Sequence, residues 1–204
     1  MKALPQHYRA VSNDIFQADA EGGEIALTST ATTDNDGASI QGKHEIFALP
    51  STAGDNIWYE TRVKVSDADQ MDLLVGMTET FTTNPEAALL SSNIIGFLLT
   101  DGSAVISGVT EASDTATTVT FENTTRATLA DDTYITLGFV ATKGTSTDTV
   151  DFYINRKKVG SSQTNIPTAN LKLTAMSLSG DATGTKVTTL DYVMAAQDRA
   201  VSYE

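Results

Sequence analysis

Two histidines, His7 and His44, are the only histidines in this 204-residue chain, and cysteine is absent. Neither histidine lies beside a serine nucleophile, and no Gly-x-Ser-x-Gly elbow occurs in the sequence. Hydrolysis by a serine–histidine–acid set needs such a nucleophile within reach of its base, so the sequence gives it no support. The lack of cysteine excludes disulfides, thiolate metal sites and a cysteine nucleophile. We expect both histidines to be solvated.

Paired carboxylates are the next chemistry to consider, because glycoside hydrolysis needs two of them flanking the scissile bond. Glu60 is followed at alternate positions by Arg62 and Lys64, where a second acid would have to stand. The three side chains share one face of a strand. We interpret them as a ladder of surface charges, which contributes little to stability.

Two acidic turns contain the oxygen ligands that calcium prefers. The first is Asp34-Asn35-Asp36, and the second contains Asp67, Asp69 and Asp72. Neither has the spacing of an EF-hand loop, and Asp and Asn are common in turns for their local hydrogen bonding. We interpret both as turns, with calcium as the alternative.

Trp58 and Tyr153 fall on the polar, outward faces of their predicted strands. An exposed aromatic ring can stack on a sugar, whereas the simpler alternative is that each ring packs beneath a loop. Arg156, Lys157 and Lys158 form the one basic cluster, interpreted as a solvated turn, and there is no glycine-rich phosphate loop. The sequence therefore predicts no catalytic, cofactor-binding or metal-ligating residue.

The elements that must position these side chains show the two-residue period of β-strands. Between Ile57 and Val65 the odd positions hold Ile, Tyr, Thr, Val and Val, while the even positions hold the tryptophan and the charges. Residues Thr133 to Gly160 repeat the pattern across a turn of small residues at 143–148. The other predicted strands are Ile25–Leu27, Ser39–Gln41, Glu45–Leu49, Leu73–Met77, Ile94–Leu99, Ala104–Val109, Thr117–Phe121, Leu171–Leu178 and Val187–Met194.

About a dozen strands with almost no helical period predict an all-β fold, a two-sheet antiparallel sandwich. Asn84-Pro85-Glu86 has the caps of a helix start, so at most one short helix is expected there. The apolar residues change parity within Leu171–Leu178, which predicts a bulge. Residues 1–24 are expected to form an extended arm that docks through Ile15 and Phe16, and residues 25–204 a single domain.

The net charge is −13, from 26 acidic and 13 basic residues. Such a field repels phosphate backbones and anionic lipid surfaces, so we expect neither nucleic acid nor a membrane as partner. The first nine residues contain no apolar run of signal-peptide length, which predicts synthesis in a cytoplasm without export by the general route.

Three passages together resemble the concanavalin-like, laminin-G-like jelly-roll family. They are Ile57–Val65, with its Trp-Tyr-Glu-x-Arg-x-Lys pattern, then Leu73–Met77, and then Val150–Asn155. The resemblance implies a jelly-roll sandwich. Hydrolases of this kind usually carry two acids on one strand in a Glu-x-Asp-x-(x)-Glu pattern, and that pattern is missing around Glu60.

More narrowly, Asp34–Gly37 and Leu129–Tyr134 resemble turns in structural proteins of tailed phages. The resemblance implies a non-enzymatic virion protein that decorates the outer capsid surface after synthesis in the host cytoplasm. Its expected partners are the major capsid protein and further copies of itself, as a dimer or trimer, with no cofactor. The alternative interpretation is a carbohydrate-binding module or a tail- or fibre-associated domain that attaches to a host glycan.

Overall fold

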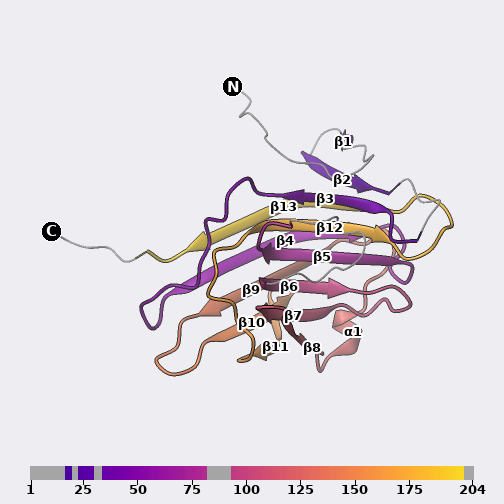
Figure 1. Cartoon of the computed structure of the whole chain (residues 1–204). Helices are drawn as coiled ribbons and strands as arrows, with labels where there is room; N and C mark the ends of the chain where they lie inside the picture. The colour runs from indigo at the N-terminus through magenta and orange to yellow at the C-terminus, as the bar shows by residue number, and fades with distance from the viewer. Residues whose placement is uncertain (1–16, 20–22, 30–33, 82–92, 200–204) are drawn as a thin grey trace.

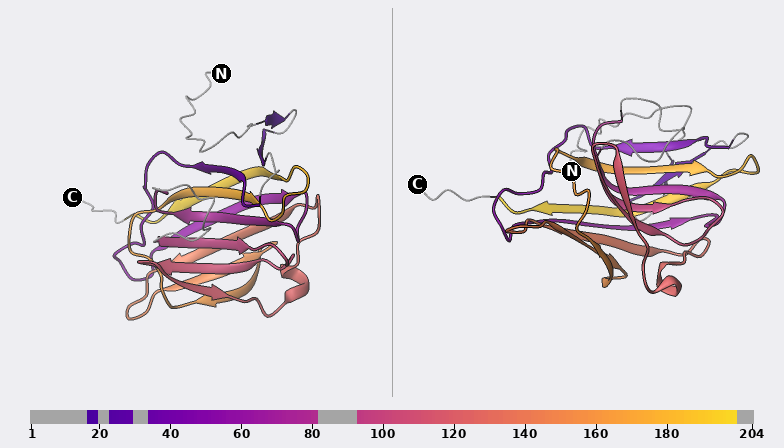
Figure 2. Two further views of the ribbon diagram at one scale, coloured as in Figure 1. Left: turned by 45° about the vertical axis from the view of Figure 1, so that its right-hand side comes forward. Right: turned by 60° about the horizontal axis from the view of Figure 1, so that its bottom comes forward.

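The computed structural model describes residues 17–19, 23–29, 34–81 and 93–199. Two antiparallel sheets lie face to face, as Figures 1 and 2 show. Sheet A has the strand order β1 (Gln17–Asp19), β2 (Glu24–Thr28), β13 (Val187–Gln197), β4 (Asn56–Val65), β9 (Ile135–Thr142), β10 (Thr149–Ile154) and β11 (Lys157–Ser162). Sheet B has the order β3 (Gly37–Gln41), β12 (Lys172–Ser179), β5 (Met71–Thr78), β6 (Asn93–Leu99), β7 (Ser107–Ala112) and β8 (Thr115–Val119). The predicted two-sheet antiparallel sandwich is confirmed.

The main core fills the space between the sheets and follows the alternation in the sequence. On β4 every second residue is buried, from Ile57 to Val65, and β10 shows the same pattern. Aromatic rings bridge the layers: Phe97 of sheet B meets Phe152 of sheet A edge-on, with ring centroids 5.4 Å apart. Tyr59 and Phe139 stack on neighbouring strands, with their centroids at 5.0 Å. These rings are part of a large buried apolar core, whose burial is the main stabilising contribution in a chain without disulfides.

A second apolar cluster lies on the outer face of sheet B. Its buried members are Leu74, Ile94, Leu98, Val109, Met176 and Leu178. Strands β5 and β6 are consequently buried on both faces. The predicted bulge in Leu171–Leu178 is wrong, because β12 pairs with β5 in unbroken register. The apolar side chains change parity there because Leu171 faces the main core while Met176 and Leu178 face the second cluster.

Three other predictions differ from the structure. Residues Glu45–Leu49 form only an isolated bridge, between Phe47 and Leu171, and β7 starts at Ser107 instead of Ala104. A short helix that the sequence analysis missed, α1 (Thr124–Ala127), is capped by the Asn123 side chain. The predicted helix at Asn84, and the arm residues 1–16 with His7, lie outside the described residues. In the described part of the chain, no helix has the length and hydropathy needed to span a bilayer.

Glu111, on β7 between Ile94 and Ala116, has an unfavourable position. It is 4% exposed, and its Oε2 is buried without a hydrogen-bond partner in the described structure. Burial, assisted by the charge of Asp114, raises the pKa of the Glu111 carboxyl. Because the folded state holds this proton more tightly, the contribution of Glu111 to stability is fully present below the ordinary glutamate pKa and is lost as the pH rises through the raised pKa.

We therefore expect Glu111→Gln to stabilise the protein at pH 8 by about 1 kcal/mol, or roughly 2–4 °C in melting temperature. At pH 4, where the native carboxyl is already protonated, the two melting temperatures should agree. Thermal melts at both pH values test this, with Glu122→Gln on an exposed acid as the control. A gain of the same size at pH 4, or a loss at pH 8, would contradict this explanation.

Candidate functional site

The outer face of sheet A carries the side chains that β4 turns away from the core. Trp58 and Glu60 project from this face, because their neighbours Ile57 and Tyr59 point inward. Glu60 lies opposite Met194 of β13 on one side and opposite Gly138 of β9 on the other. Strand pairing thus brings residues from β13, β4 and β9 into one short stretch of surface.

A hollow of about 890 Å³ lies over these strands. Its outward-facing lining residues are Trp58, Glu60, Gly138, Val140, Tyr153, Arg156, Met194 and Ala196. Around the free part of β13 it also reaches Tyr59, Phe139, Val193 and Ala195 of sheet A and Leu173 of sheet B. We call this hollow the Trp58 groove. Trp58 is 38% exposed and Met194 is 54% exposed, although both are large apolar side chains. Exposed apolar surface grouped in this way marks a binding surface.

Gly138 forms the floor of the groove. A Cβ at this position would come within 2.9 Å of the Tyr59 carbonyl oxygen. Glycine is therefore needed at position 138 for β4 and β9 to lie this close together. With no side chain between Glu60 and Tyr153, the backbone is bare at the centre of the hollow. A flat ligand ring can therefore lie against the sheet beside the indole of Trp58.

The Glu60 carboxylate is held in one orientation at the edge of this floor. Its Oε1 accepts hydrogen bonds from the Tyr192 hydroxyl, at 2.8 Å, and from Arg156 Nη2, at 3.2 Å. Arg156 Nε donates to Oε2 at 3.3 Å. The Arg156 guanidinium holds the pKa of Glu60 below its ordinary range, with help from Tyr192, although burial opposes the shift. Glu60 is thus ionised at neutral pH and presents a fixed hydrogen-bond acceptor.

Farther along β4, the cations stack on an aromatic ring. The guanidinium carbon of Arg62 lies 4.0 Å from the centre of the Tyr134 ring, and Lys64 Nζ lies 4.8 Å from it. Arg62 Nη1 also donates to Asp191 Oδ2 at 2.6 Å. The Tyr134 hydroxyl donates to Glu24, and burial, followed by this contact, raises the pKa of Tyr134 to about 12.

Most charges on this face are paired with one another, whereas Lys64 lies over the Tyr134 ring. Besides Arg62 with Asp191 and Arg156 with Glu60, Lys158 Nζ lies 2.7 Å from Asp151 Oδ1. Glu60, Arg62 and Lys64 share a face, as predicted. The ion pairs run across strands instead of along β4. The face is therefore close to neutral in a chain whose net charge is −13.

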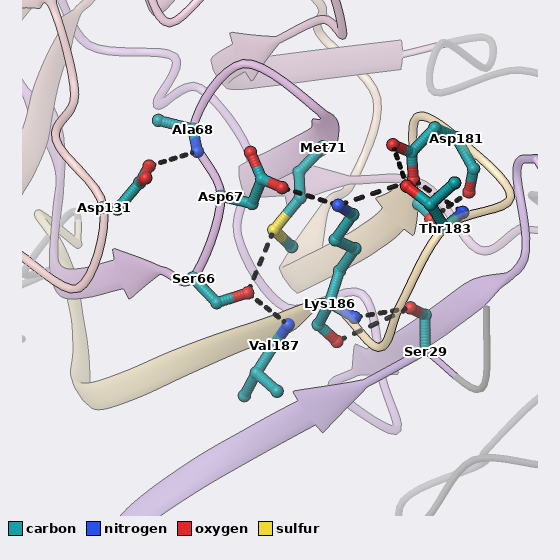
Figure 3. Close-up of polar contacts among 11 residues, drawn as sticks. Ser29, Ser66, Asp67, Ala68, Met71, Asp131, Asp181, Thr183, Lys186 and Val187 are labelled. Atoms are coloured by element: carbon teal, nitrogen blue, oxygen red, sulfur yellow. Dashed lines mark hydrogen bonds and ion pairs between the residues drawn. The ribbon is translucent and has the colours of Figure 1, made fainter.

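The acidic turn at Asp67 is neutralised by a lysine, as Figure 3 shows. Lys186 Nζ lies 2.5 Å from Asp67 Oδ2 and 3.4 Å from Asp181 Oδ1, and its side chain is only 7% exposed. The Lys186 N–H also donates to the Ser29 hydroxyl at 3.2 Å. The ammonium group thus joins two loops that are far apart in sequence.

The remaining candidate residues lie apart from the groove. His44 is exposed, and Asp72 accepts a hydrogen bond from the Asp101 N–H at 2.9 Å. Asn35, between the acids of the first turn, has a φ of 63° and donates its N–H to the Ser179 carbonyl. Among the described residues, no group of three His, Cys, Asp or Glu side chains converges as a metal site would require.

Comparison with known proteins identifies the fold. No protein-family model matches the sequence, and no curated protein matches it. A prokaryotic β-1,3-1,4-glucanase (lichenase) derived from a mouse hindgut metagenome has a similar solved structure, with a TM-score of 0.61 at 12% identity over 97% of this chain and 95% of that chain. The neighbours are concanavalin-like jelly rolls. This protein has the same fold.

Two further structures extend the comparison. A native glycosidic hydrolase matches with a TM-score of 0.62 at 15% identity, covering 91% of this chain and 88% of its own. The carbohydrate recognition domain of Emp47p matches with a TM-score of 0.61 at 10% identity, covering 96% and 90%. The concanavalin-like part of the predicted resemblance is confirmed by these neighbours.

The comparisons contradict the predicted function. The sequence analysis expected a non-enzymatic virion decoration protein, whereas the structural neighbours are mostly glycosidases and polysaccharide lyases. Neighbours of this kind also overturn the prediction that the chain has no enzymatic role.

Proposed function

We propose that this protein binds a polysaccharide chain in the Trp58 groove on the outer face of sheet A. The observation that carries this proposal is the exposed indole of Trp58, which stands beside bare backbone and an oriented carboxylate. Ligand sites are mostly apolar surfaces with a few well-placed polar groups, and this groove has that composition.

Each lining residue has a role in holding a sugar ring. The C–H face of a ring packs against Trp58 and Met194, which buries their exposed apolar surface. A hydroxyl group on the ring donates to the ionised Glu60 carboxylate, whose orientation Arg156 and Tyr192 fix in advance. The outward-facing Tyr153 phenol lies on the other side of Gly138 from Glu60. The sugar ring can therefore be held between the Trp58 and Tyr153 side chains.

The charge distribution favours a neutral polysaccharide. Arg62, Arg156 and Lys158 on this face are already paired with acids, which leaves Lys64, over the Tyr134 ring, as the one cation of β4 without an acid partner among the described residues. The net charge of −13 repels a polyanion at longer range. The structurally similar enzymes include a β-1,3-1,4-glucanase and an alginate lyase, and a β-glucan fits this surface better than alginate does.

Affinity electrophoresis in gels that contain lichenan, laminarin or alginate tests the proposal. We expect retardation by a neutral β-glucan and none by alginate. Retardation by no polysaccharide, or by alginate alone, would contradict it. New reducing ends, measured in solution mixtures of the same polymers, distinguish binding alone from binding with cleavage.

A further inference from the structure

A second hollow, of about 520 Å³, lies on the neighbouring part of the surface. It is formed where α1, the start of β9 and the β10–β11 turn meet. Its polar lining residues are Asn123, Thr125, Arg126, Thr128, Thr133 and Asn155. Tyr134, whose ring supports Arg62 and Lys64 on the outer face of sheet A, forms part of the same wall.

The β10–β11 turn joins this hollow to the Trp58 groove. Asn155 lines the second hollow, and the adjacent Arg156 lines the groove. Both residues have positive φ angles, 49° and 61°, as the central residues of a tight type I′ hairpin turn do. The turn is fixed to β9, because Asn155 donates its N–H to the Thr136 carbonyl at 2.7 Å and its Oδ1 accepts the Thr136 N–H at 3.0 Å. The two hollows therefore keep a constant separation.

We propose that the second hollow is a further subsite for the same polysaccharide, so that the preferred ligand is an oligosaccharide long enough to reach both hollows. This inference rests on the proposed function of the Trp58 groove. The outward residues of β4 run from Trp58 to Lys64, a length of about 20 Å at the ordinary rise of a strand. Several consecutive sugar rings fit over such a length, whereas a disaccharide occupies only part of it.

The chemistry of the second hollow suits a neutral, hydroxyl-rich ligand. Its amide and hydroxyl side chains can both donate and accept hydrogen bonds. Arg126 has no ion-pair partner among the described residues, so its guanidinium donors remain open to a ligand oxygen. This distinguishes it from Arg62 and Arg156, which are both paired with acids.

Isothermal titration calorimetry with gluco-oligosaccharides prepared from mixed-linkage β-glucan tests the inference. We expect the hexasaccharide to bind about tenfold more tightly than the disaccharide, as extra hydrogen bonds add to the affinity. Arg126→Ala should weaken the hexasaccharide about fivefold and leave the disaccharide within about twofold. Lys43→Ala, on an exposed residue away from both hollows, is the matched control and should change neither.

The outcomes separate this inference from the proposed function. Equal affinity for the two oligosaccharides would overturn the second subsite while leaving the groove in place. An Arg126→Ala effect of the same size on both ligands would do so as well, because it would indicate a general structural change. If no gluco-oligosaccharide binds at all, the proposed function and this inference are both wrong.

Discussion

Replacing Trp58 by alanine is expected to weaken binding of mixed-linkage β-glucan by about thirtyfold, equivalent to about 2 kcal/mol. The indole supplies the largest flat apolar surface of the groove, and no neighbouring side chain can take its place. Because Trp58 faces outward from β4, its removal leaves the core residues Ile57 and Tyr59 undisturbed. Affinity electrophoresis in lichenan gels, with the melting temperature as a check on folding, measures the effect.

Two further variants make this prediction sharper. Trp58→Phe should retain part of the affinity, because a smaller aromatic face can still stack. Ile46→Ala removes a large apolar side chain that is 67% exposed, the highest value among the described residues, from outside the groove and should have no effect. Unchanged binding by Trp58→Ala, or an equal loss in Ile46→Ala, would exclude the groove as the binding site.

Replacing Lys186 by methionine is expected to destabilise the fold by about 2 kcal/mol, or roughly 4–8 °C in melting temperature. Methionine keeps most of the buried hydrocarbon but leaves Asp67 and Asp181 without their shared cation. These acids are 29% and 26% exposed, so water recovers part of their solvation and the loss stays below that of a fully buried pair. Denaturant unfolding at pH 7 measures the difference.

The pH dependence identifies the cause of this loss. The hydrogen bond to Asp67 raises the pKa of Lys186, so its contribution is fully present below the ordinary lysine pKa of about 10.4 and is lost as the pH rises through the raised value. As the pH rises through this value, the wild-type protein should lose the stability that Lys186 contributes. The Lys186→Met variant has no such contribution to lose, so its stability should fall less over the same pH range. Lys158→Met, on a pair whose lysine is 52% exposed, should cost less than about 1 kcal/mol. Equal losses for the two lysines would show that burial of Lys186 has no special role.

The sequence predicts the sandwich well wherever one face of a strand is buried and the other is wet. Strands β4 and β10 alternate in this way, and their bounds differ from the predicted ones by a residue at most. Prediction fails where both faces are buried, because β12 then loses its two-residue period without any bulge. Prediction of a strand depends on the alternation of apolar and polar residues. This alternation disappears where a second apolar cluster covers the outer face of sheet B.

The candidate site is less predictable, because its contacts join distant parts of the chain. Trp58 and Glu60 were recognisable as outward-facing, but Arg156 lies 96 residues from Glu60, and Tyr192 lies 132 residues from it. Tyr192 also follows an irregularity in β13, where the register shifts between Leu190 and Tyr192. Strict alternation counted from the buried Leu190 would turn Asp191 outward and Tyr192 inward. It therefore does not predict that both side chains have partners on this face. The short helix that borders the second hollow was missed because four residues are too few for a helical period.

Intrinsic fluorescence tests the central claim most directly, because Trp58 is the only tryptophan in the chain. Titration with lichenan should give a saturable shift of the emission toward shorter wavelength as a sugar ring displaces water from the indole. The half-saturation point should agree with the affinity found by electrophoresis. Saturable lichenan binding with unchanged tryptophan emission would place the polysaccharide elsewhere on the molecule and contradict the account.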